Sequence, residues 1–210
     1  MAFTTLFIDL DDTVYPKTSG LWQAIRRRLD LYMLERVHIP SAEIPAMRDH
    51  LFTTYGTTMR GLQAIYDIDT QDFLAYVHDV PISNFIQADL TVRAALLSLP
   101  QRKIIFTNAD TNHARRVLDV LAISDCFDKI IDINAISPYC KPQPEAFRIA
   151  LQSAVEQDAS RCVMVDDLPR NLAAARQLGF YTVRLGSVEP SDKYHTGILH
   201  LSELGQVINS

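Results

Sequence analysis

The chain has 210 residues, which is long enough for one full hydrophobic core and a sizeable insertion. Its contents of 48% hydrophobic and 21% charged residues exclude a disordered or fibrous protein. The net charge of −5 at pH 7 argues against a nucleic-acid polymer or a membrane surface as a partner, because both need a basic field. A small anionic substrate stays compatible with this charge if a local site supplies cations.

The first expected element is an apolar β-strand in residues 3–10. It runs into the stretch FIDLDDTVYP, which holds Asp9, Asp11 and Asp12 within four positions. Carboxylates this close repel one another, so something must stabilise their charge. Asp12 precedes Thr13 and fits a turn that points away from a metal better than it fits a ligand.

Residues 15–88 follow this strand and contain helical patterns without a convincing strand. Apolar residues recur on one side of residues 21–37 and 44–55, and Asp69 is suited to cap a further helix. The pattern predicts an all-helical insertion after the first strand. The expected domains are this insertion and a core in two parts, with boundaries 15–88, and 1–14 with 89–210.

Beyond the insertion, short apolar runs alternate with segments of helical spacing. Further strands are expected at residues 103–107, 129–133, 162–165 and 181–185. Gly179 is suited to end the helix between the last two strands. The alternation predicts an α/β fold with a doubly wound parallel sheet, which is a Rossmann-like core.

Polar residues stand at the ends of three of these strands, namely Asp9, then Thr107 with Asn108, then Asp166 with Asp167. In open α/β sheets, ligands bind outside the carboxyl ends of the strands, so these residues should converge. Two acidic clusters would repel each other there unless a cation lay between them, and carboxylate and carbonyl oxygens suit Mg²⁺. Mg²⁺ is therefore the expected cofactor.

Two more groups fit this site, the hydroxyl of Thr107 and the ammonium of Lys141 in the segment YCKPQPEAF. Hydrogen-bond donors, a lysine and Mg²⁺ together are suited to stabilise a transferring phosphoryl group. Taken singly, each segment also fits a helix cap or a surface turn. The combination of three polar clusters and a lysine favours a catalytic site.

These motifs occur in the order DLDDT, Thr107, Lys141 and Asp166-Asp167. Over nearly its whole length the chain thereby resembles the haloacid dehalogenase-like (HAD) hydrolase superfamily, whose first signature is DxDxT. The helical insertion resembles the mobile cap of that superfamily, with residues 15–20 and 83–89 as hinges.

The resemblance implies a two-step mechanism through an aspartyl-phosphate. Asp9 would attack the phosphorus, and Asp11 would protonate the leaving oxygen and then deprotonate the hydrolytic water. The implied ligands of Mg²⁺ are Asp9, the backbone carbonyl of Asp11, Asp167 and, directly or through water, Asp166. The implied ligands of the phosphoryl oxygens are Thr107, the backbone amide of Asn108, and Lys141.

Two other polar residues near the motifs receive lesser roles. Asn171 stands where many relatives carry another acid, and we assign it an orienting role only. His113 is expected to cap or decorate its helix, and no histidine receives a catalytic role.

The segment YGTTMRGL in the insertion, together with DLDDTVYP, FTNADTNHARRVL and VDDLPRN, resembles the pyrimidine 5′-nucleotidase branch of the superfamily. The cap would select the substrate through candidate contacts at Tyr55, Thr57, Thr58 and Arg60. The alternative is an ordinary turn between two helices with a solvated arginine.

The leading hypothesis is a Mg²⁺-dependent phosphomonoester hydrolase that acts on nucleoside monophosphates, pyrimidine ones first. A phosphatase or phosphomutase for another small phosphorylated metabolite is the alternative, with sugar phosphates, flavin mononucleotide and pyridoxal phosphate as candidates. A haloacid dehalogenase fits less well, because metal-free dehalogenases generally lack an acid at the position of Asp11. A binding protein without turnover also fits less well, because no central motif residue is missing.

The cysteines Cys126, Cys140 and Cys162 lack the spacing of a zinc site, and core packing or chance explains each of them better. The first residues have no leader pattern, and no window approaches the length of a membrane span. We therefore expect a cytoplasmic protein. Both a monomer and a homodimer are compatible with the sequence.

Overall fold

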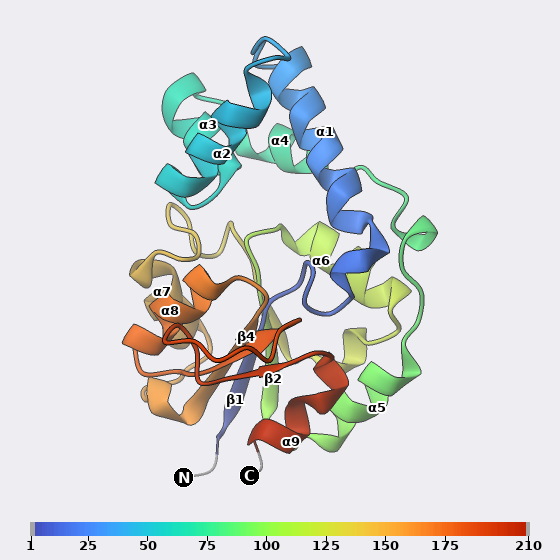
Figure 1. The fold of residues 1–210 in the computed structure, drawn as a ribbon, viewed down its shortest axis with the longest axis vertical. Coiled ribbons are helices and arrows are strands. Elements are labelled where there is room, and N and C mark those ends of the chain that lie inside the picture. Colours follow the sequence, from blue (N-terminus) through green and yellow to red (C-terminus); the bar gives the residue numbers. More distant parts are fainter. Residues whose placement is uncertain (1–2, 209–210) are drawn as a thin grey trace. The chain divides into compact units, whose positions relative to one another are not determined.

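A parallel β-sheet organises most of the chain in the computed structural model, which describes residues 3–208 (Figure 1). Its strands are β1 (Thr5–Ile8), β2 (Arg102–Phe106), β3 (Lys129–Ile131), β4 (Cys162–Asp166), β5 (Tyr181–Leu185) and β6 (Thr196–Ile198). They lie in the order β3-β2-β1-β4-β5-β6, and every neighbouring pair is parallel. The strand order reverses between β1 and β4, the place where open α/β sheets bind ligands.

Helices cover both faces of this sheet, which confirms the predicted doubly wound fold. They are α5 (Leu90–Ser98), α6 (Thr111–Val120), α7 (Pro144–Ser153), α8 (Pro169–Gln177) and α9 (Leu204–Ile208). Figure 1 shows α7 and α8 on one side of the strands and α5 and α6 on the other. Burial on both faces explains why the central strands are continuous apolar runs rather than alternating ones.

Aromatic rings pack against one another in the core beside the sheet. Phe7 on β1 packs edge-on against Phe106 on β2 and Phe180 before β5, with ring centroids 6.3 and 5.6 Å apart. Such edge-to-face pairs add to the burial of apolar area. The rings therefore join β1, β2 and the residue that precedes β5 in one core.

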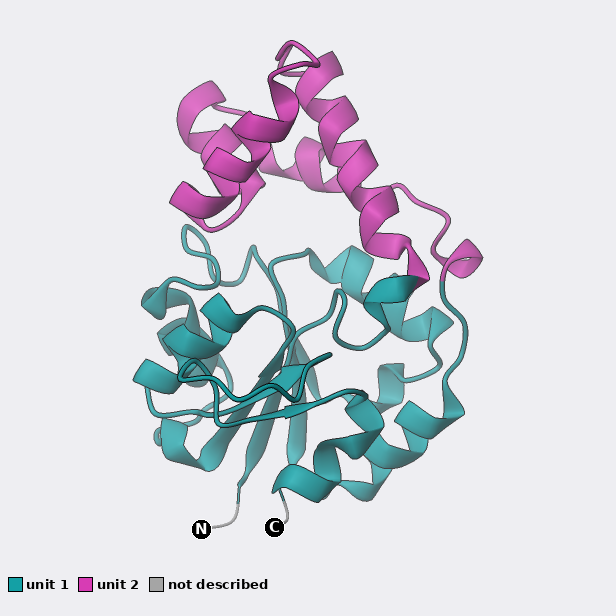
Figure 2. Ribbon diagram, in the orientation of Figure 1, with its two compact units in different colours: residues 1–18, 86–210 teal, residues 19–85 magenta. Residues whose placement is uncertain are grey.

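The chain divides into two compact units (Figure 2). Residues 19–85 form a helical unit, and the described residues before 19 and after 85 form the unit that holds the sheet. The helical unit contains α1 (Leu21–Glu35), α2 (Ile44–Tyr55), α3 (Thr58–Tyr66) and α4 (Thr70–Val77). Asp69 caps α4 as expected, because its Oδ1 accepts from the amides of Gln71 and Asp72. Gly61 allows α3 to approach α2, since a Cβ there would lie 2.7 Å from Cβ of Leu51.

Short 3₁₀ helices complete the backbone: Lys17–Ser19, Ile82–Asn84, Ser124–Cys126, Ala159–Arg161 and Leu201–Glu203. All three cysteines are buried, as expected for core residues. Among residues 3–208, no helix is both long and apolar enough to cross a lipid bilayer.

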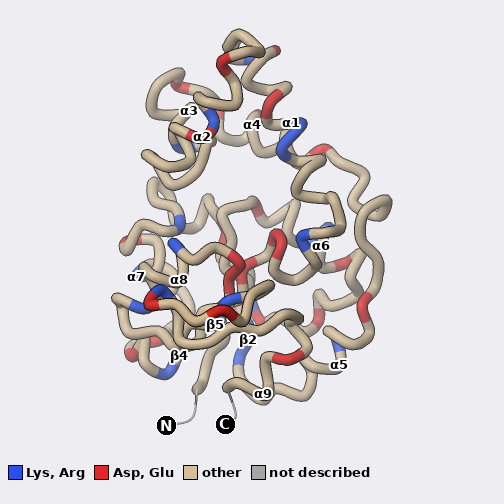
Figure 3. Tube along the Cα trace, in the orientation of Figure 1, with Lys and Arg blue, Asp and Glu red and all other residues tan. Residues whose placement is uncertain are grey.

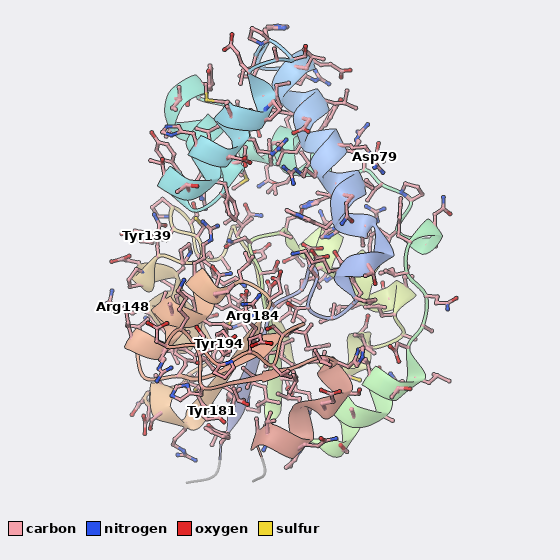
Figure 4. All side chains as sticks on the ribbon, in the orientation of Figure 1. Asp79, Tyr139, Arg148, Tyr181, Arg184 and Tyr194 are labelled. Carbon is pink, nitrogen blue, oxygen red and sulfur yellow. The ribbon has the colours of Figure 1, made fainter. Side chains whose placement is uncertain are left out.

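The sequence analysis did not predict the edge strand β6. The segment before it is held by side chains around β5, where Tyr181 stacks on His195 with ring centroids 4.8 Å apart. Nδ1 of His195 accepts from the amide of Thr182 at 3.1 Å. The guanidinium of Arg184 lies 5.7 Å from the ring centre of Tyr194 (Figure 4). Side chains distant in sequence thus fix β6, and no apolar run marks it.

Candidate active site

The carboxyl ends of the three central strands carry the predicted acidic residues. Asp9 follows β1, Asp166 ends β4, and Asp167 comes next, with one carboxylate oxygen of each lying within 4.8 Å of the others. Figure 3 shows acidic segments meeting near the middle of the unit that holds the sheet. The structure therefore brings together the two acidic clusters that the sequence analysis expected to converge.

Lys141 lies between these carboxylates. Its Nζ donates to Oδ1 of Asp9 at 2.7 Å, to Oδ2 of Asp166 at 2.9 Å and to the carbonyl of Phe106 at 2.7 Å. The lysine is 1% exposed. Burial alone would lower the pKa of Lys141, but the carboxylates of Asp166 and Asp9 outweigh it and raise that pKa, so the side chain is an ammonium.

Asp166 is fully buried and held by several donors. Its Oδ1 accepts from the amide of Leu168 at 2.8 Å, and the side-chain amide of Asn171 donates to Oδ2 at 2.9 Å and to Oδ1 at 3.1 Å. Asn171 therefore fixes the orientation of Asp166. Together with Lys141, these donors satisfy much of the hydrogen-bonding capacity of this carboxylate.

The other two carboxylates of the cluster carry raised pKa values. Burial, opposed by Lys141 and reinforced by Asp166, raises the pKa of Asp9 to about 7. Burial and then the charges of Asp166 and Asp9 raise the pKa of Asp167 to about 8. When all three carboxylates are ionised, they carry more negative charge than Lys141 offsets, and the atoms that they offer to a cation are all oxygens. These properties fit a hard divalent cation such as Mg²⁺.

Asp12 occupies the predicted turn, with a left-handed φ of 58°. The turn is closed by bonds from the amides of Thr13 and Val14 to the carbonyl of Leu10, at 3.2 and 2.9 Å. The carboxylate of Asp12 is nevertheless buried, and its Oδ1 has no hydrogen-bond partner among the described residues. Burial raises the pKa of Asp12 to about 6, and its charge contributes to the raised pKa of Asp167.

The loop after β2 is tied to the segment that carries Lys141. Oδ1 of Asn108 accepts from the amide of Lys141 at 2.9 Å, and Nδ2 of Asn108 donates to the Lys141 carbonyl at 3.0 Å. Thr107 is buried, and its Oγ1 accepts from the amide of Ala109 at 2.9 Å. Asn108 therefore ties the loop that carries Thr107 to Lys141, which lies beside Asp9.

His113 corrects the sequence analysis. The expectation that this side chain caps or decorates its helix is wrong, because Asp110 caps α6 and His113 is 1% exposed. His113 lies four residues before Val117, on the apolar side of α6, so it points inward. Its Nε2 lies 2.9 Å from Oδ1 of Asp11. The helical spacing in the sequence indicates this inward orientation, because His113 lines up with the core positions of α6.

Tyr15 is a second residue at the site to which the sequence analysis gave no role there. Its hydroxyl donates to the same oxygen, Oδ1 of Asp11, at 2.6 Å. Tyr15 is 2% exposed. Burial and then the carboxylate of Asp11 raise the pKa of Tyr15 well above its ordinary value, so the phenol keeps its proton and donates it to this bond.

The candidate substrate residues of the insertion lie around the turn between α2 and α3, in the helical unit. The hydroxyl of Thr57 accepts from the amide of Arg60 at 3.1 Å and so caps α3, and Tyr55 ends α2. Arg60 is 8% exposed, and its Nη1 donates to Oε1 of Gln63 at 3.0 Å. The alternative of a solvated arginine is therefore wrong. Thr58, the first residue of α3, is also buried.

Comparison with known proteins adds a family match and several relatives. A family model described as haloacid dehalogenase-like hydrolase matches residues 3–179. Phosphate metabolism protein 8 of Saccharomyces cerevisiae is 27% identical over 188 residues, which are 82% of this chain and 58% of that protein. The chain thus spans little more than half the length of this relative.

Solved structures with the same fold include three that cover nearly the whole chain. The HAD-hydrolase YfnB from Bacillus subtilis, bound to magnesium, has a TM-score of 0.67 at 16% identity, with 100% of both chains covered. The β-phosphoglucomutase of Clostridium difficile has a TM-score of 0.64 at 20% identity, covering 97% of this chain and 93% of its own. The 2-haloacid dehalogenase of Pseudomonas syringae pv. Tomato has a TM-score of 0.63 at 23% identity, covering 100% and 99%. At these identities the likeness shows the fold alone.

Proposed function

The chain belongs to the haloacid dehalogenase-like hydrolase family, and on that premise we propose that it hydrolyses phosphomonoesters through a phosphoryl intermediate on Asp9. The observation that carries this proposal is the buried contact of Lys141 with both Asp9 and Asp166 beside Asp167. It supplies an attacking carboxylate, a fixed positive charge and oxygen ligands for a cation in one place. Phosphoryl transfer needs this combination.

In the first step, an oxygen of Asp9 bonds to the phosphorus while the bond from phosphorus to the ester oxygen breaks. A carboxylate needs no base to become a nucleophile, and the ammonium of Lys141 favours its ionised form. Asp11 gives a proton to the leaving oxygen. In the second step, Asp11 takes a proton from water, which attacks the phosphorus and releases inorganic phosphate and Asp9.

The phosphoryl oxygens would be bound by the hydroxyl of Thr107, the backbone amide of Asn108 and the ammonium of Lys141. Lys141 already lies beside the nucleophile, and the side chain of Asn108 ties these segments together. The proposed residues that hold Mg²⁺ are Asp9, the backbone carbonyl of Asp11, Asp167 and, directly or through water, Asp166. The metal, when bound, would add positive charge where the phosphoryl group gains negative charge.

We propose nucleoside monophosphates, pyrimidine ones first, as substrates. The support is the similarity of YGTTMRGL and the core motifs to the nucleotidase branch, with Tyr55, Thr57, Thr58 and Arg60 as the substrate contacts. The name of the yeast relative also points to phosphate chemistry. A phosphomutase is the second candidate, because the fold is shared with a β-phosphoglucomutase and the catalytic motifs do not separate the two reactions.

The test is phosphate release, with Mg²⁺ present, from nucleoside monophosphates, flavin mononucleotide, pyridoxal phosphate and sugar phosphates. We expect release from pyrimidine nucleotides, with at least about a 10³-fold loss in Asp9→Asn. Asp192→Asn, at an exposed position, is the control for the same chemical change. Turnover by Asp9→Asn would overturn the nucleophile assignment, and a profile centred on sugar phosphates would overturn the nucleotidase assignment. Formation of an isomerised sugar phosphate without free phosphate would identify a mutase.

A further inference from the structure

The carboxylate of Asp11 is held by two aromatic side chains from distant parts of the chain. Tyr15 comes from the turn after β1, and His113 comes from α6, 102 positions further along the chain than Asp11. Both contacts end on the same atom, Oδ1, at 2.6 Å from the Tyr15 hydroxyl and 2.9 Å from Nε2 of His113. Both rings are almost fully buried, whereas the side chain of Asp11 keeps 16% exposure.

Two contacts on one oxygen fix the rotation of the carboxyl group. The last torsion of an aspartate is broad when nothing restrains it. An acid or base works only within hydrogen-bond reach of the proton that it moves, and a displacement of about 1 Å can cost about 100-fold in rate. Two buried rings are therefore suited to hold such a group in place.

Both contacts act on Asp11 as donors when its carboxyl group is ionised. A carboxylate oxygen only accepts hydrogen bonds, so Nε2 of His113 then carries the hydrogen in this contact. The Tyr15 hydroxyl donates to the same oxygen.

We propose that Tyr15 and His113 are positioning residues for Asp11, which hold its carboxyl group through Oδ1 in the orientation from which it exchanges a proton with the leaving group and with the hydrolytic water. This inference rests on the proposed function, because it gives Asp11 the role of acid and base. The alternative is that the two contacts only tie the turn after β1 to α6. Loss of such a structural contact would lower the stability of the fold, and its effect on kcat/KM would be the same for every leaving group.

Leaving groups of different acidity separate these explanations. A phosphate ester with an alkyl leaving group needs a proton as the bond to phosphorus breaks, whereas 2,4-dinitrophenyl phosphate does not. The quantity to measure is kcat/KM, because it reports the steps up to formation of the phosphoryl intermediate. Asp11→Asn sets the scale, since it removes the acid itself.

Tyr15→Phe removes one donor and leaves the ring. We expect kcat/KM for an alkyl phosphate to fall about 10- to 100-fold, within the range of general acid catalysis, and that for 2,4-dinitrophenyl phosphate to fall less than about 3-fold. His113→Met should show the same pattern, and His113→Gln, which keeps a side-chain donor, should recover most of the alkyl rate. Thermal unfolding of each variant monitors the fold, and Tyr15→Phe decides alone if His113→Met does not fold.

Equal losses for both esters in Tyr15→Phe would overturn the inference and leave a structural tie. Equal rates of His113→Gln and His113→Met would also overturn it for His113. Failure of the proposed function is distinguishable, because the unsubstituted protein would then release no phosphate from either ester, or Asp9→Asn would remain active.

Discussion

The ammonium of Lys141 lies 2.7 Å from Oδ1 of Asp9, a residue 132 positions away in the sequence, and bonds Asp166 as well. One buried lysine thereby links the ends of β1 and β4, which are neighbours in the sheet. Removing one partner of a buried ion pair is costly, because the remaining charge keeps its burial without compensation. Both the stability of the fold and the ionisation of Asp9 therefore depend on the contact between Lys141 and Asp9.

Lys141→Met should lower the free energy of unfolding by about 3–5 kcal/mol and abolish phosphate release. The matched control is Lys17→Met, because Lys17 is 4.0 Å from Asp167 with its side chain 69% exposed. That change should cost less than about 1 kcal/mol, as expected of exposed ion pairs. Urea unfolding at neutral pH measures both variants. A loss in Lys141→Met as small as that in Lys17→Met would contradict this account of the site.

Magnesium should stabilise the folded protein if Asp9, Asp166 and Asp167 hold it. A ligand that binds only the folded state adds about 2.7 kcal/mol when its concentration is 100 times its dissociation constant. Asp167→Asn should remove most of this gain, whereas Asp192→Asn should keep it. The measurement is thermal unfolding in a chelator and in millimolar Mg²⁺, and it needs no substrate. An equal gain in both variants would place the metal elsewhere.

The metal-free protein should lose stability as the pH rises from about 4 to about 8. The pKa values of Asp12, Asp9 and Asp167 are raised in the folded state to about 6, 7 and 8 from an ordinary value of 3.8, chiefly by burial. The folded state therefore binds more protons than the unfolded state in this window, so stability falls with pH, by up to about 1.4 kcal/mol per pH unit for each proton. The loss is complete above the folded pKa values.

Urea unfolding in a chelator at several pH values measures this slope. Asp12→Asn should reduce it mainly between about pH 4 and 6, where Asp12 contributes. Saturating Mg²⁺ should flatten the slope, because a cation favours the ionised carboxylates. A stability that rises with pH in the chelator would contradict the burial of these charges.

Periodicity predicted the sheet because each central strand is a buried apolar run with polar residues at its end. The rule that ligands bind at the carboxyl ends of parallel strands places Asp9, Thr107 and Asp166 at one edge of the sheet from the sequence alone. Periodicity could not predict β6, which has three residues, includes Gly197, and is held by contacts from distant segments. Short edge strands depend on tertiary contacts more than on their own sequence.

Contacts between side chains that are far apart in the sequence could not be predicted either. The spacing of DLDDT marks Asp11, but no local pattern shows that Tyr15 and His113 bond its carboxylate. The sequence does indicate that His113 points into the core, because it lines up with Val117 on the buried side of α6. A buried histidine needs a polar partner, so its position on the core side of α6 predicts a contact with an acid or another polar group.

Arg60 should affect the choice of substrate more than the chemistry if the helical unit recognises the nucleoside. We expect Arg60→Gln to raise KM for uridine 5′-monophosphate about 10-fold, the effect of about 1.4 kcal/mol of lost binding, and to change kcat/KM for a small aryl phosphate less than about 2-fold. Arg26→Gln is the control, because Arg26 is an exposed arginine on α1 of the same unit. Parallel losses with both substrates in Arg60→Gln would show that Arg60, which bonds Gln63, only supports the helical unit.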